Sequence, residues 1–159
     1  IEKILKKISW NKIFNGLPSP IHGDLQFDNI IFDKKNHKFK LIDWRENFAG
    51  NKIYGDLYYD LAKLRGGIDI NYKKIKQNNF YFNKKKNLIK YSIKWNNSEL
   101  RKTFEQYIKD KNYSFYKIYI LIGLIFLNMS PLHNYPFDKL LFYHSKYFLN
   151  KIINDNDTK

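Results

Sequence analysis

The sequence contains no cysteine. This absence excludes disulfide bonds and thiolate metal sites, and it fits a cytoplasmic protein. The chain begins Ile1-Glu2-Lys3, with neither an initiator Met nor a cleavable apolar leader. We therefore expect a cytoplasmic chain that is part of a longer protein.

Long apolar runs are also scarce. The strongest candidate is residues 115–129, and its apolar part is shorter than the about 20 residues that a membrane-spanning helix needs. We interpret this run as a central buried helix that ends before Pro131, and we expect no membrane span.

Acidic residues and arginines are few beside the lysines. The chain has 29 Lys and Arg against 15 Asp and Glu, a formal net charge of +14, yet its only arginines are Arg45, Arg65 and Arg101. Such a charge is typical of proteins that bind nucleic acid or an anionic surface. Arginine, however, is the residue expected at bidentate phosphate or base contacts. We favour a bias in composition and expect no nucleic-acid partner, with a basic nucleic-acid-binding module as an alternative.

The most informative stretch is Ile21-His22-Gly23-Asp24-Leu25-Gln26-Phe27-Asp28-Asn29. An apolar run follows at 30–32, then a polar turn at 33–38 and a second run that ends in Leu41-Ile42-Asp43-Trp44. This alternation predicts strands joined by a hairpin, with Asp24, Asn29 and Asp43 at the points where strands meet loops. The alternative is that these residues only form turns, which Gly, Asp and Asn favour for conformational reasons.

These three side chains suit phosphoryl transfer. The transition state is loose and its charge spreads over phosphate oxygens, so catalysis consists of positioning and of neutralisation by cations. One carboxylate orients and deprotonates a hydroxyl group. A second carboxylate and an amide oxygen hold Mg²⁺, which takes few protein oxygens and keeps waters and phosphates as its other ligands.

The pattern His-Gly-Asp-x-x-x-x-Asn followed by Ile-Asp-Trp resembles the catalytic and metal-binding loops of the aminoglycoside phosphotransferase and choline kinase family, which has a protein-kinase-like fold. The resemblance implies that Asp24 is the catalytic base and that Asn29 and Asp43 bind Mg²⁺ together with ATP or GTP. It covers nearly the whole chain but only the carboxy-terminal lobe of the family.

A second motif supports the first. Gly55-Asp56-x-x-x-Asp60-Leu61-Ala62 resembles the start of a helix in that family, where an aspartate anchors the catalytic loop. The sequence leaves open whether Asp56 or Asp60 has this role here. Asp56 also fits as the N-cap of the helix.

Three residues near the motif are candidates for supporting roles. We expect His22 to be structural, with its ring hydrogen-bonded to backbone near the metal loop, rather than catalytic. Gln26 is a candidate contact with a phosphate or with the substrate. Arg45 either pairs with Asp24 or with a substrate anion, or is a solvated loop charge.

The rest of the chain is predicted to be mainly helical. Helical spacing of apolar residues predicts helices at 1–15, 56–65, 98–109, 115–129 and 136–153. Pro18-Ser19-Pro20 is predicted as a turn, and Gly66-Gly67 as the end of the second helix. His144 is expected to be a buried or half-buried core residue rather than a ligand.

Residues 89–95 alternate between apolar and polar side chains, which predicts a half-buried strand. The aromatic stretch 79–83 is its candidate partner, so 78–96 is predicted to be a hairpin with its turn at 84–87. We favour a hairpin whose aromatic face packs on the helices. The alternatives are a surface that stacks on single-stranded nucleic acid and a border of the acceptor pocket.

We therefore predict an α+β fold that is mainly α. Residues 1–153 are expected to form a protein-kinase-like carboxy-terminal lobe, a helical bundle with small β-hairpins that carry the catalytic loops, with 78–96 as an insertion. Residues 154–159 are expected to be a flexible tail.

The resemblance implies an ATP- or GTP-dependent kinase that phosphorylates a hydroxyl of a small molecule such as choline, a sugar or an amino sugar; by analogy, it could serve bacterial surface-polysaccharide (capsule) metabolism. The family's amino-terminal lobe, with its phosphate-covering loop, is not in this sequence. We expect that lobe as a partner and expect the isolated fragment to be inactive. A further alternative is a non-catalytic kinase-like scaffold that binds a partner protein.

Overall fold

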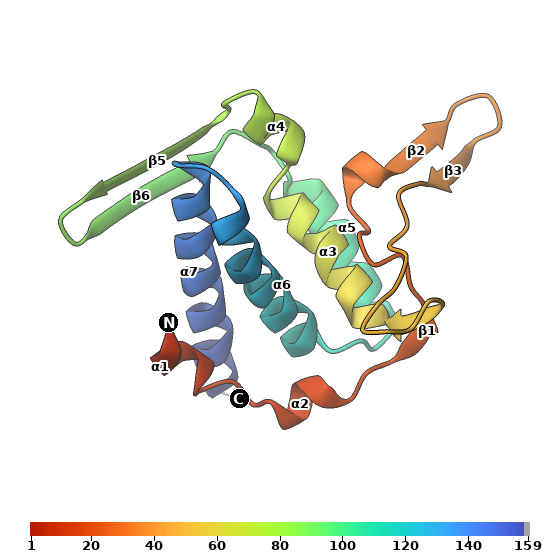
Figure 1. Cartoon of the computed structure of the whole chain (residues 1–159), viewed down its shortest axis with the longest axis horizontal. Helices are drawn as coiled ribbons and strands as arrows, with labels where there is room; N and C mark the ends of the chain where they lie inside the picture. Colours follow the sequence, from red (N-terminus) through yellow and green to blue (C-terminus); the bar gives the residue numbers. More distant parts are fainter. Residues whose placement is uncertain (158–159) are drawn as a thin grey trace.

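The computed structural model describes residues 1–157 and is an α+β fold that is mainly α-helical, as predicted. Helix α6 packs against α3 on one side and α7 on the other, and α5 packs against α3 (Figure 1). The helices that make up this body are α3 Leu57–Asp69, α5 Ser98–Asp110, α6 Phe115–Met129 and α7 Phe137–Asp157.

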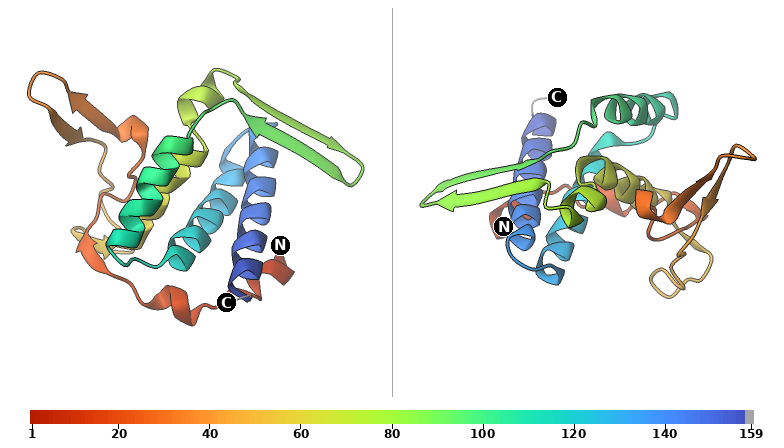
Figure 2. Two further views of the ribbon diagram at one scale, coloured as in Figure 1. Left: turned by 180° about the vertical axis from the view of Figure 1, so that it is seen from behind. Right: turned by 90° about the horizontal axis from the view of Figure 1, so that it is seen from above.

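Strands occur in short antiparallel pairs. The pairs are β1 Pro18–Pro20 with β4 Tyr54–Asp56, β2 Ile30–Asp33 with β3 Lys38–Leu41, and β5 Phe80–Lys85 with β6 Leu88–Ile93. Figures 1 and 2 show that the β2–β3 and β5–β6 hairpins project from opposite ends of the helical body. Both hairpins were predicted from the sequence, and the structure confirms them.

Short helical segments complete the described chain. They are α1 Glu2–Leu5, α2 Asn11–Phe14, α4 Tyr72–Lys76 and the 3₁₀ turns η1 Phe27–Asn29 and η2 Ser130–Leu132. Segment η1 lies between the loop that carries Asp24 and strand β2. It therefore connects the predicted catalytic loop directly to the hairpin that leads to Asp43.

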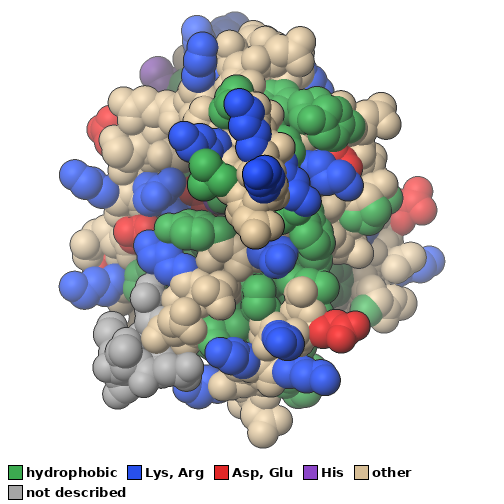
Figure 3. Space-filling model, turned by 90° about the vertical axis from the view of Figure 1, so that its left-hand side faces the viewer, with side chains coloured by type: hydrophobic (Ala, Val, Ile, Leu, Met, Phe, Trp, Pro, Cys, Tyr) green, Lys and Arg blue, Asp and Glu red, His purple; other side chains and the backbone are tan. Residues whose placement is uncertain are grey.

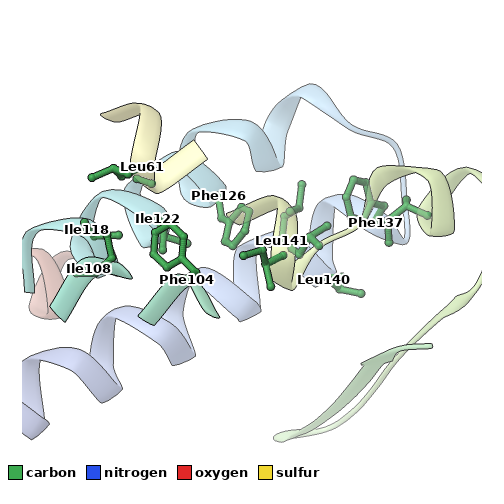
Figure 4. Close-up of a cluster of buried hydrophobic side chains, with 13 residues drawn as sticks. Leu61, Phe104, Ile108, Ile118, Ile122, Phe126, Phe137, Leu140 and Leu141 are labelled. Atoms are coloured by element: carbon green, nitrogen blue, oxygen red, sulfur yellow. The ribbon is translucent and has the colours of Figure 1, made fainter. Parts of the chain in front are cut away.

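The main core lies where α3, α5, α6 and α7 meet (Figure 4). Its buried side chains include Leu61, Phe104, Ile108, Ile118, Ile122, Phe126, Leu140 and Leu141. Full burial of such a side chain stabilises a fold by about 1.5–3 kcal/mol. Helix α6 contributes Ile118, Ile122 and Phe126 to this set, which confirms the prediction of a core helix at 115–129.

Helices α6 and α7 approach closely at a glycine. The Oγ atom of Ser145 donates a hydrogen bond of 2.7 Å to the carbonyl of Gly123. A Cβ atom at Gly123 would overlap the side chain of Leu149, which is fully buried. The small residue therefore sets the distance between the two helices.

Helix α6 and the 3₁₀ turn η2 together form a long apolar stretch. By length and composition alone, Phe115–Leu132 could cross a membrane, because η2 extends the apolar run of α6. In this fold 39% of that stretch is buried, and α6 packs against α3 and α7.

The amino-terminal prediction was wrong in detail. The structure has the short helices α1 and α2 where the sequence predicts one helical stretch over 1–15. Ile8 and Ile13 both belong to a core cluster with Leu149, although residues five apart point about 140° apart on a continuous helix. Breaking the helix allows both to be buried, and the backbone N–H of Ser9 donates to the Tyr116 hydroxyl at 2.9 Å.

Two predicted boundaries were also wrong. Pro18-Ser19-Pro20 forms strand β1 rather than a turn, because it pairs with β4 just before α3. Gly66 and Gly67 lie inside α3, which continues to Asp69. They are buried against Phe126 and Phe27, where larger residues would be crowded.

The hairpin β5–β6 packs its aromatic face on α7, which confirms the favoured interpretation. Phe80 contacts Phe137 with ring centroids 5.8 Å apart, and Phe82 stacks on Tyr143 at 6.0 Å. The Tyr91 hydroxyl lies 3.1 Å from Nδ1 of His144, so His144 is a half-buried core residue as expected. The short helix α4 that precedes the hairpin was not predicted.

Helix α7 continues to Asp157. It therefore runs past residue 154, where the sequence predicts the start of a flexible tail. The rest of that predicted tail, 158–159, lies outside the described residues.

Candidate active site

The loop after β1 is held by a buried carboxylate on α3. The backbone N–H groups of His22 and Gly23 donate to Oδ2 and Oδ1 of Asp60 at 2.7 and 2.9 Å. Asp60 is only 5% exposed, so these are charge-assisted bonds in a region of low dielectric. Of the two aspartates that the sequence leaves open, Asp60 anchors this loop.

Asp56 caps the amino-terminal end of α3 and does not hold this loop. Its Oδ1 accepts hydrogen bonds from the backbone N–H of Tyr58 at 3.1 Å and of Leu17 at 3.0 Å. It is thus the N-cap of α3, as predicted. Its other oxygen pairs with the buried ammonium of Lys117 at 3.1 Å, and that ammonium also donates to the Asn15 carbonyl. Asp56 therefore ties β1 and α6 to the start of α3 and makes no contact with Asp24.

The ring of His22 is hydrogen-bonded to backbone groups, as expected. The side chain is 2% exposed, and its Nε2 lies 2.9 Å from the carbonyl oxygen of Ile42. The backbone N–H of Asp24 donates to Nδ1 at 3.2 Å, which fixes the proton on Nε2. The ring stacks on Trp44 with centroids 4.8 Å apart. His22 thereby joins the loop that carries Asp24 to the loop that follows β3.

Gly23 allows these two loops to approach. Its φ of +79° suits glycine, and a Cβ atom there would lie 2.7 Å from Cβ of Arg45. The backbone N–H of Arg45 donates to the His22 carbonyl at 2.9 Å. The Arg45 guanidinium lies over the ring of Tyr59, 5.9 Å from its centroid, rather than against Asp24.

The carboxylate of Asp24 is oriented from several directions. Nζ of Lys63 on α3 lies 2.6 Å from Oδ1. The side-chain amides of Gln26 and Asn29 each donate to Oδ2 at 3.2 Å, and the Asn29 amide also donates to the Asp24 carbonyl at 2.9 Å. The Asp24 side chain is 27% exposed, so its carboxylate is fixed in place while the side chain remains accessible.

Lys63 is the site residue that the sequence analysis missed. A signal was available, because Asp60 and Lys63 are three residues apart on α3 and so lie on the same face. Once Asp60 is known to hold the loop, Lys63 is the next side chain able to reach Asp24. It is 10% exposed, so its charge is poorly solvated and depends on this partner.

The residues proposed as metal ligands have free oxygen atoms. Asn29 uses its amide nitrogen on Asp24, and no hydrogen bond to its Oδ1 occurs within residues 1–157. The exposed carboxylate of Asp43 likewise has no ion pair or hydrogen bond in the described range. The backbone N–H of Ile42 donates to the Asn29 carbonyl at 3.0 Å, so Asp43 follows a residue that is bonded directly to this loop.

The free oxygen atoms of Asn29 and Asp43 are of the kind that Mg²⁺ prefers. Over the described part of the chain, no group of three or more His, Asp or Glu side chains is arranged to hold a metal ion. One carboxylate and one amide oxygen are what Mg²⁺ takes when phosphates and waters supply its other ligands. Asn29 and Asp43 offer these two groups.

Asp24 faces a cleft of about 460 Å³. One wall carries Asp24, Lys63, Arg45 and Tyr59, and the other is formed by α6 and η2. This volume lies in the range of about 300–1,000 Å³ that is typical of small-molecule sites. The hairpin β5–β6 contributes no residue to this cleft.

Tyr72 lies close enough to respond to the charge of Asp24. Burial raises the pKa of the Tyr72 phenol, and the negative charge of Asp24 raises it further. The hydroxyl donates to Sδ of Met129 at 3.5 Å. Tyr72 is therefore neutral at physiological pH and adds no competing anion beside Asp24.

The abundant lysines form no single stripe in the view of Figure 3. Lys and Arg side chains are scattered over that face, with hydrophobic side chains between them.

Comparisons of this chain with protein-family models, with curated proteins and with solved structures find no match. The site residues form one assembly in which Asp24, Gln26, Asn29 and Lys63 are in contact, with Asp60 and His22 behind them.

Proposed function

We propose that this chain is the carboxy-terminal catalytic lobe of a small-molecule kinase with a protein-kinase-like fold. It would transfer the γ-phosphoryl group of ATP or GTP to a hydroxyl group. The observation that carries the proposal is the Asp24 carboxylate, which is oriented by Lys63, Gln26 and Asn29 at the wall of a small-molecule cleft. The resemblance to the aminoglycoside phosphotransferase and choline kinase family assigns the same residue as base.

Asp24 has the accessibility and orientation that a base needs. The acceptor hydroxyl would donate its hydrogen bond to the carboxylate, which takes up the proton as the oxygen attacks. A bond forms between the acceptor oxygen and the γ-phosphorus. The bond from that phosphorus to the β,γ-bridging oxygen breaks, and the nucleoside diphosphate leaves with the electron pair.

Lys63 and Asp60 would prepare this step without taking part in proton transfer. Lys63 keeps the carboxylate in one rotamer beside the cleft, and Asp60 fixes the backbone of the loop. Preorganised groups of this kind avoid reorganisation during the reaction. His22 holds the two loops together through its two ring nitrogens.

Asn29 and Asp43 would hold Mg²⁺, since their oxygen atoms are free and they come from adjacent loops. When bound, the cation neutralises the charge of the triphosphate and of the transferring group. An amino-terminal lobe would supply the remaining nucleotide contacts. The isolated chain is accordingly proposed to have little activity without that lobe.

Transfer of radiolabelled γ-phosphate tests the proposal. The full-length protein is incubated with ATP or GTP, Mg²⁺ and a panel of small alcohols, sugars, amino sugars, hydroxy acids and hydroxyl-bearing phosphate esters, and labelled products are separated from nucleotide. We expect a labelled phosphate ester that depends on Mg²⁺ and on the acceptor. If neither nucleotide yields an ester with any acceptor, while the protein remains folded, the kinase proposal fails.

A further inference from the structure

We infer that the acceptor is a hydroxyl compound that carries its own oxyanion, a carboxylate or a phosphate, on a largely apolar skeleton. This inference rests on the proposed function and deepens it, because it concerns the cleft that Asp24 faces. The cleft has two unlike walls, one polar and charged and one apolar, and each limits what can bind there.

The polar wall has an excess of positive charge. Asp24 is the only acidic residue that lines the cleft within the described chain, and Lys63 pairs with it at 2.6 Å. Arg45 lines the same cleft and forms no ion pair with any described residue. The pair of Asp24 and Lys63 sums to zero, so the guanidinium leaves a net charge of +1.

Arg45 is held where a ligand can reach it. Its backbone is bonded to His22, its Cβ packs on Gly23, and its guanidinium rests on the ring of Tyr59. The side chain is exposed, with its planar donors unused by protein carboxylates. A guanidinium presents a fork of N–H donors that matches a carboxylate or phosphate in bidentate geometry.

The same features disfavour a cationic acceptor. Recognition of a quaternary ammonium or an amino sugar needs acidic side chains or an aromatic cage. Here the one carboxylate is neutralised by Lys63, and Tyr59 already stacks with Arg45. Choline and amino sugars would therefore meet uncompensated positive charge in this cleft.

The opposite wall is apolar. It consists of α6 side chains that face the cleft, including Leu124, Ile125 and Met129, followed by Leu132 in η2. Asn128 is the only polar side chain on this wall. A ligand with its hydroxyl at Asp24 and its oxyanion at Arg45 would lay its carbon skeleton against these residues, where apolar contact is favourable.

Binding of matched probes to the full-length protein tests the inference. The carboxylate probe is 3-hydroxybutyrate, with 1,3-butanediol as its neutral counterpart. The phosphate probe is glycerol 3-phosphate, with glycerol as counterpart, and choline represents cations. Affinities are measured by NMR titration at low and high salt, for the wild type and for Arg45→Gln, Arg45→Lys and Lys40→Gln. Lys40 is exposed on β3 and outside the cleft, so its substitution controls for the loss of one charge.

We expect at least one anion to bind at least about tenfold more tightly than its neutral counterpart and than choline, with the preference weakened by salt. Arg45→Gln should remove this preference, Arg45→Lys should retain part of it, and Lys40→Gln should leave it intact. Preference for 3-hydroxybutyrate alone identifies a carboxylate as the anion, and preference for glycerol 3-phosphate alone identifies a phosphate.

No binding of either anion, equal binding of choline, or an unchanged preference in Arg45→Gln overturns the inference. These results are separable from failure of the kinase proposal. Anion binding through Arg45 with no phosphoryl transfer to any acceptor counts against the kinase proposal alone. Efficient transfer to uncharged alcohols that is insensitive to Arg45→Gln counts against the anionic acceptor alone.

Discussion

Nζ of Lys63 lies 2.6 Å from Oδ1 of Asp24, which joins the middle of α3 to the loop after β1. The neighbouring turn of α3 contributes Asp60, whose carboxylate accepts the backbone N–H groups of His22 and Gly23. A single helix face therefore fixes both the backbone of the loop and the side chain at its accessible point. The proposed site depends on α3 as much as on the motif itself.

Substitution of Lys63 should affect turnover more than nucleotide binding. Lys63→Met removes the ammonium at similar side-chain length, so Asp24 loses its shortest contact. A charge-assisted hydrogen bond contributes about 1.5–3 kcal/mol, which corresponds to a loss of about 10- to 100-fold in kcat. Steady-state kinetics should show this loss with little change in the KM for nucleotide.

The matched control is Lys34→Met in the exposed turn of the β2–β3 hairpin. It removes the same group away from the cleft and should leave kcat unchanged. Lys63→Arg should restore part of the activity. If Lys63→Met had the kcat of the wild type, Lys63 would have no positioning role.

Substitution of Asp60 should lower stability as well as activity. Asp60→Ala leaves the buried N–H groups of His22 and Gly23 without acceptors. Each unsatisfied group costs about 1–3 kcal/mol, so the free energy of unfolding should fall by about 2–5 kcal/mol. Urea denaturation measures this loss. The control is Asp28→Ala, at an exposed position of η1. Its free energy of unfolding should fall by less than about 1 kcal/mol.

The close approach of α6 and α7 predicts a coupled pair of mutations. Gly123→Ala would overlap Leu149 and should destabilise by about 1–3 kcal/mol. Leu149→Ala removes a fully buried side chain and should cost about 2–5 kcal/mol. In the double mutant the new methyl group occupies space that Leu149 vacates, so the combined loss should be smaller than the sum. Strict additivity in denaturant unfolding would show that the two residues are not in contact.

Acidification should weaken the fold through His144. Burial lowers the pKa of its imidazole below the ordinary value of 6.5, with opposing contributions from Asp69 on one side and Arg65 and Arg101 on the other. The unfolded chain then takes up a proton near pH 6.5 that the folded chain resists. The free energy of unfolding should therefore decrease as pH falls below that value, and should be insensitive to this group above it.

The measurement is urea denaturation at about pH 7.5 and about pH 5.5 for the wild type and His144→Phe. On acidification, the free energy of unfolding of His144→Phe should decrease less than that of the wild type. The decrease that remains in the variant comes from His133, because burial lowers the pKa of that imidazole as well. His37→Gln, in an exposed turn, should behave like the wild type. An identical pH dependence for His144→Phe and the wild type would exclude His144 as the cause.

Sequence patterns correctly predicted those parts of the fold that are determined by residues near one another in the chain. Two apolar runs around a polar turn identified the β2–β3 hairpin, and period-two alternation identified the β5–β6 hairpin. The capping role of Asp56 was evident from its place before an apolar helix. The hydrogen bond from the His22 ring to backbone was likewise predicted, from the place of His22 in the motif. For the hairpins and for the cap, the decisive residues lie close together in the sequence or recur at a regular spacing.

Contacts between distant segments account for the failures. The break between α1 and α2 results from burial of Ile8 and Ile13 in the core cluster that contains Leu149. Gly66 is a helix residue rather than a helix end because Phe126 packs against it. The pairing of Lys63 with Asp24 likewise depends on how α3 meets the loop, which helical periodicity alone does not specify.

The central claim is tested most directly by measuring phosphoryl transfer and nucleotide affinity in Asp24→Asn and in the matched variant Asp28→Asn of the full-length protein. Asp28 lies in the same loop region, but it is exposed and has only a long surface contact of 3.7 Å with Lys76. Asp24→Asn should lose about 10²- to 10⁴-fold in transfer rate, the usual contribution of a general base, while its nucleotide Kd stays that of the wild type. Asp28→Asn should match the wild type in both. Transfer by Asp24→Asn at the wild-type rate would contradict the account.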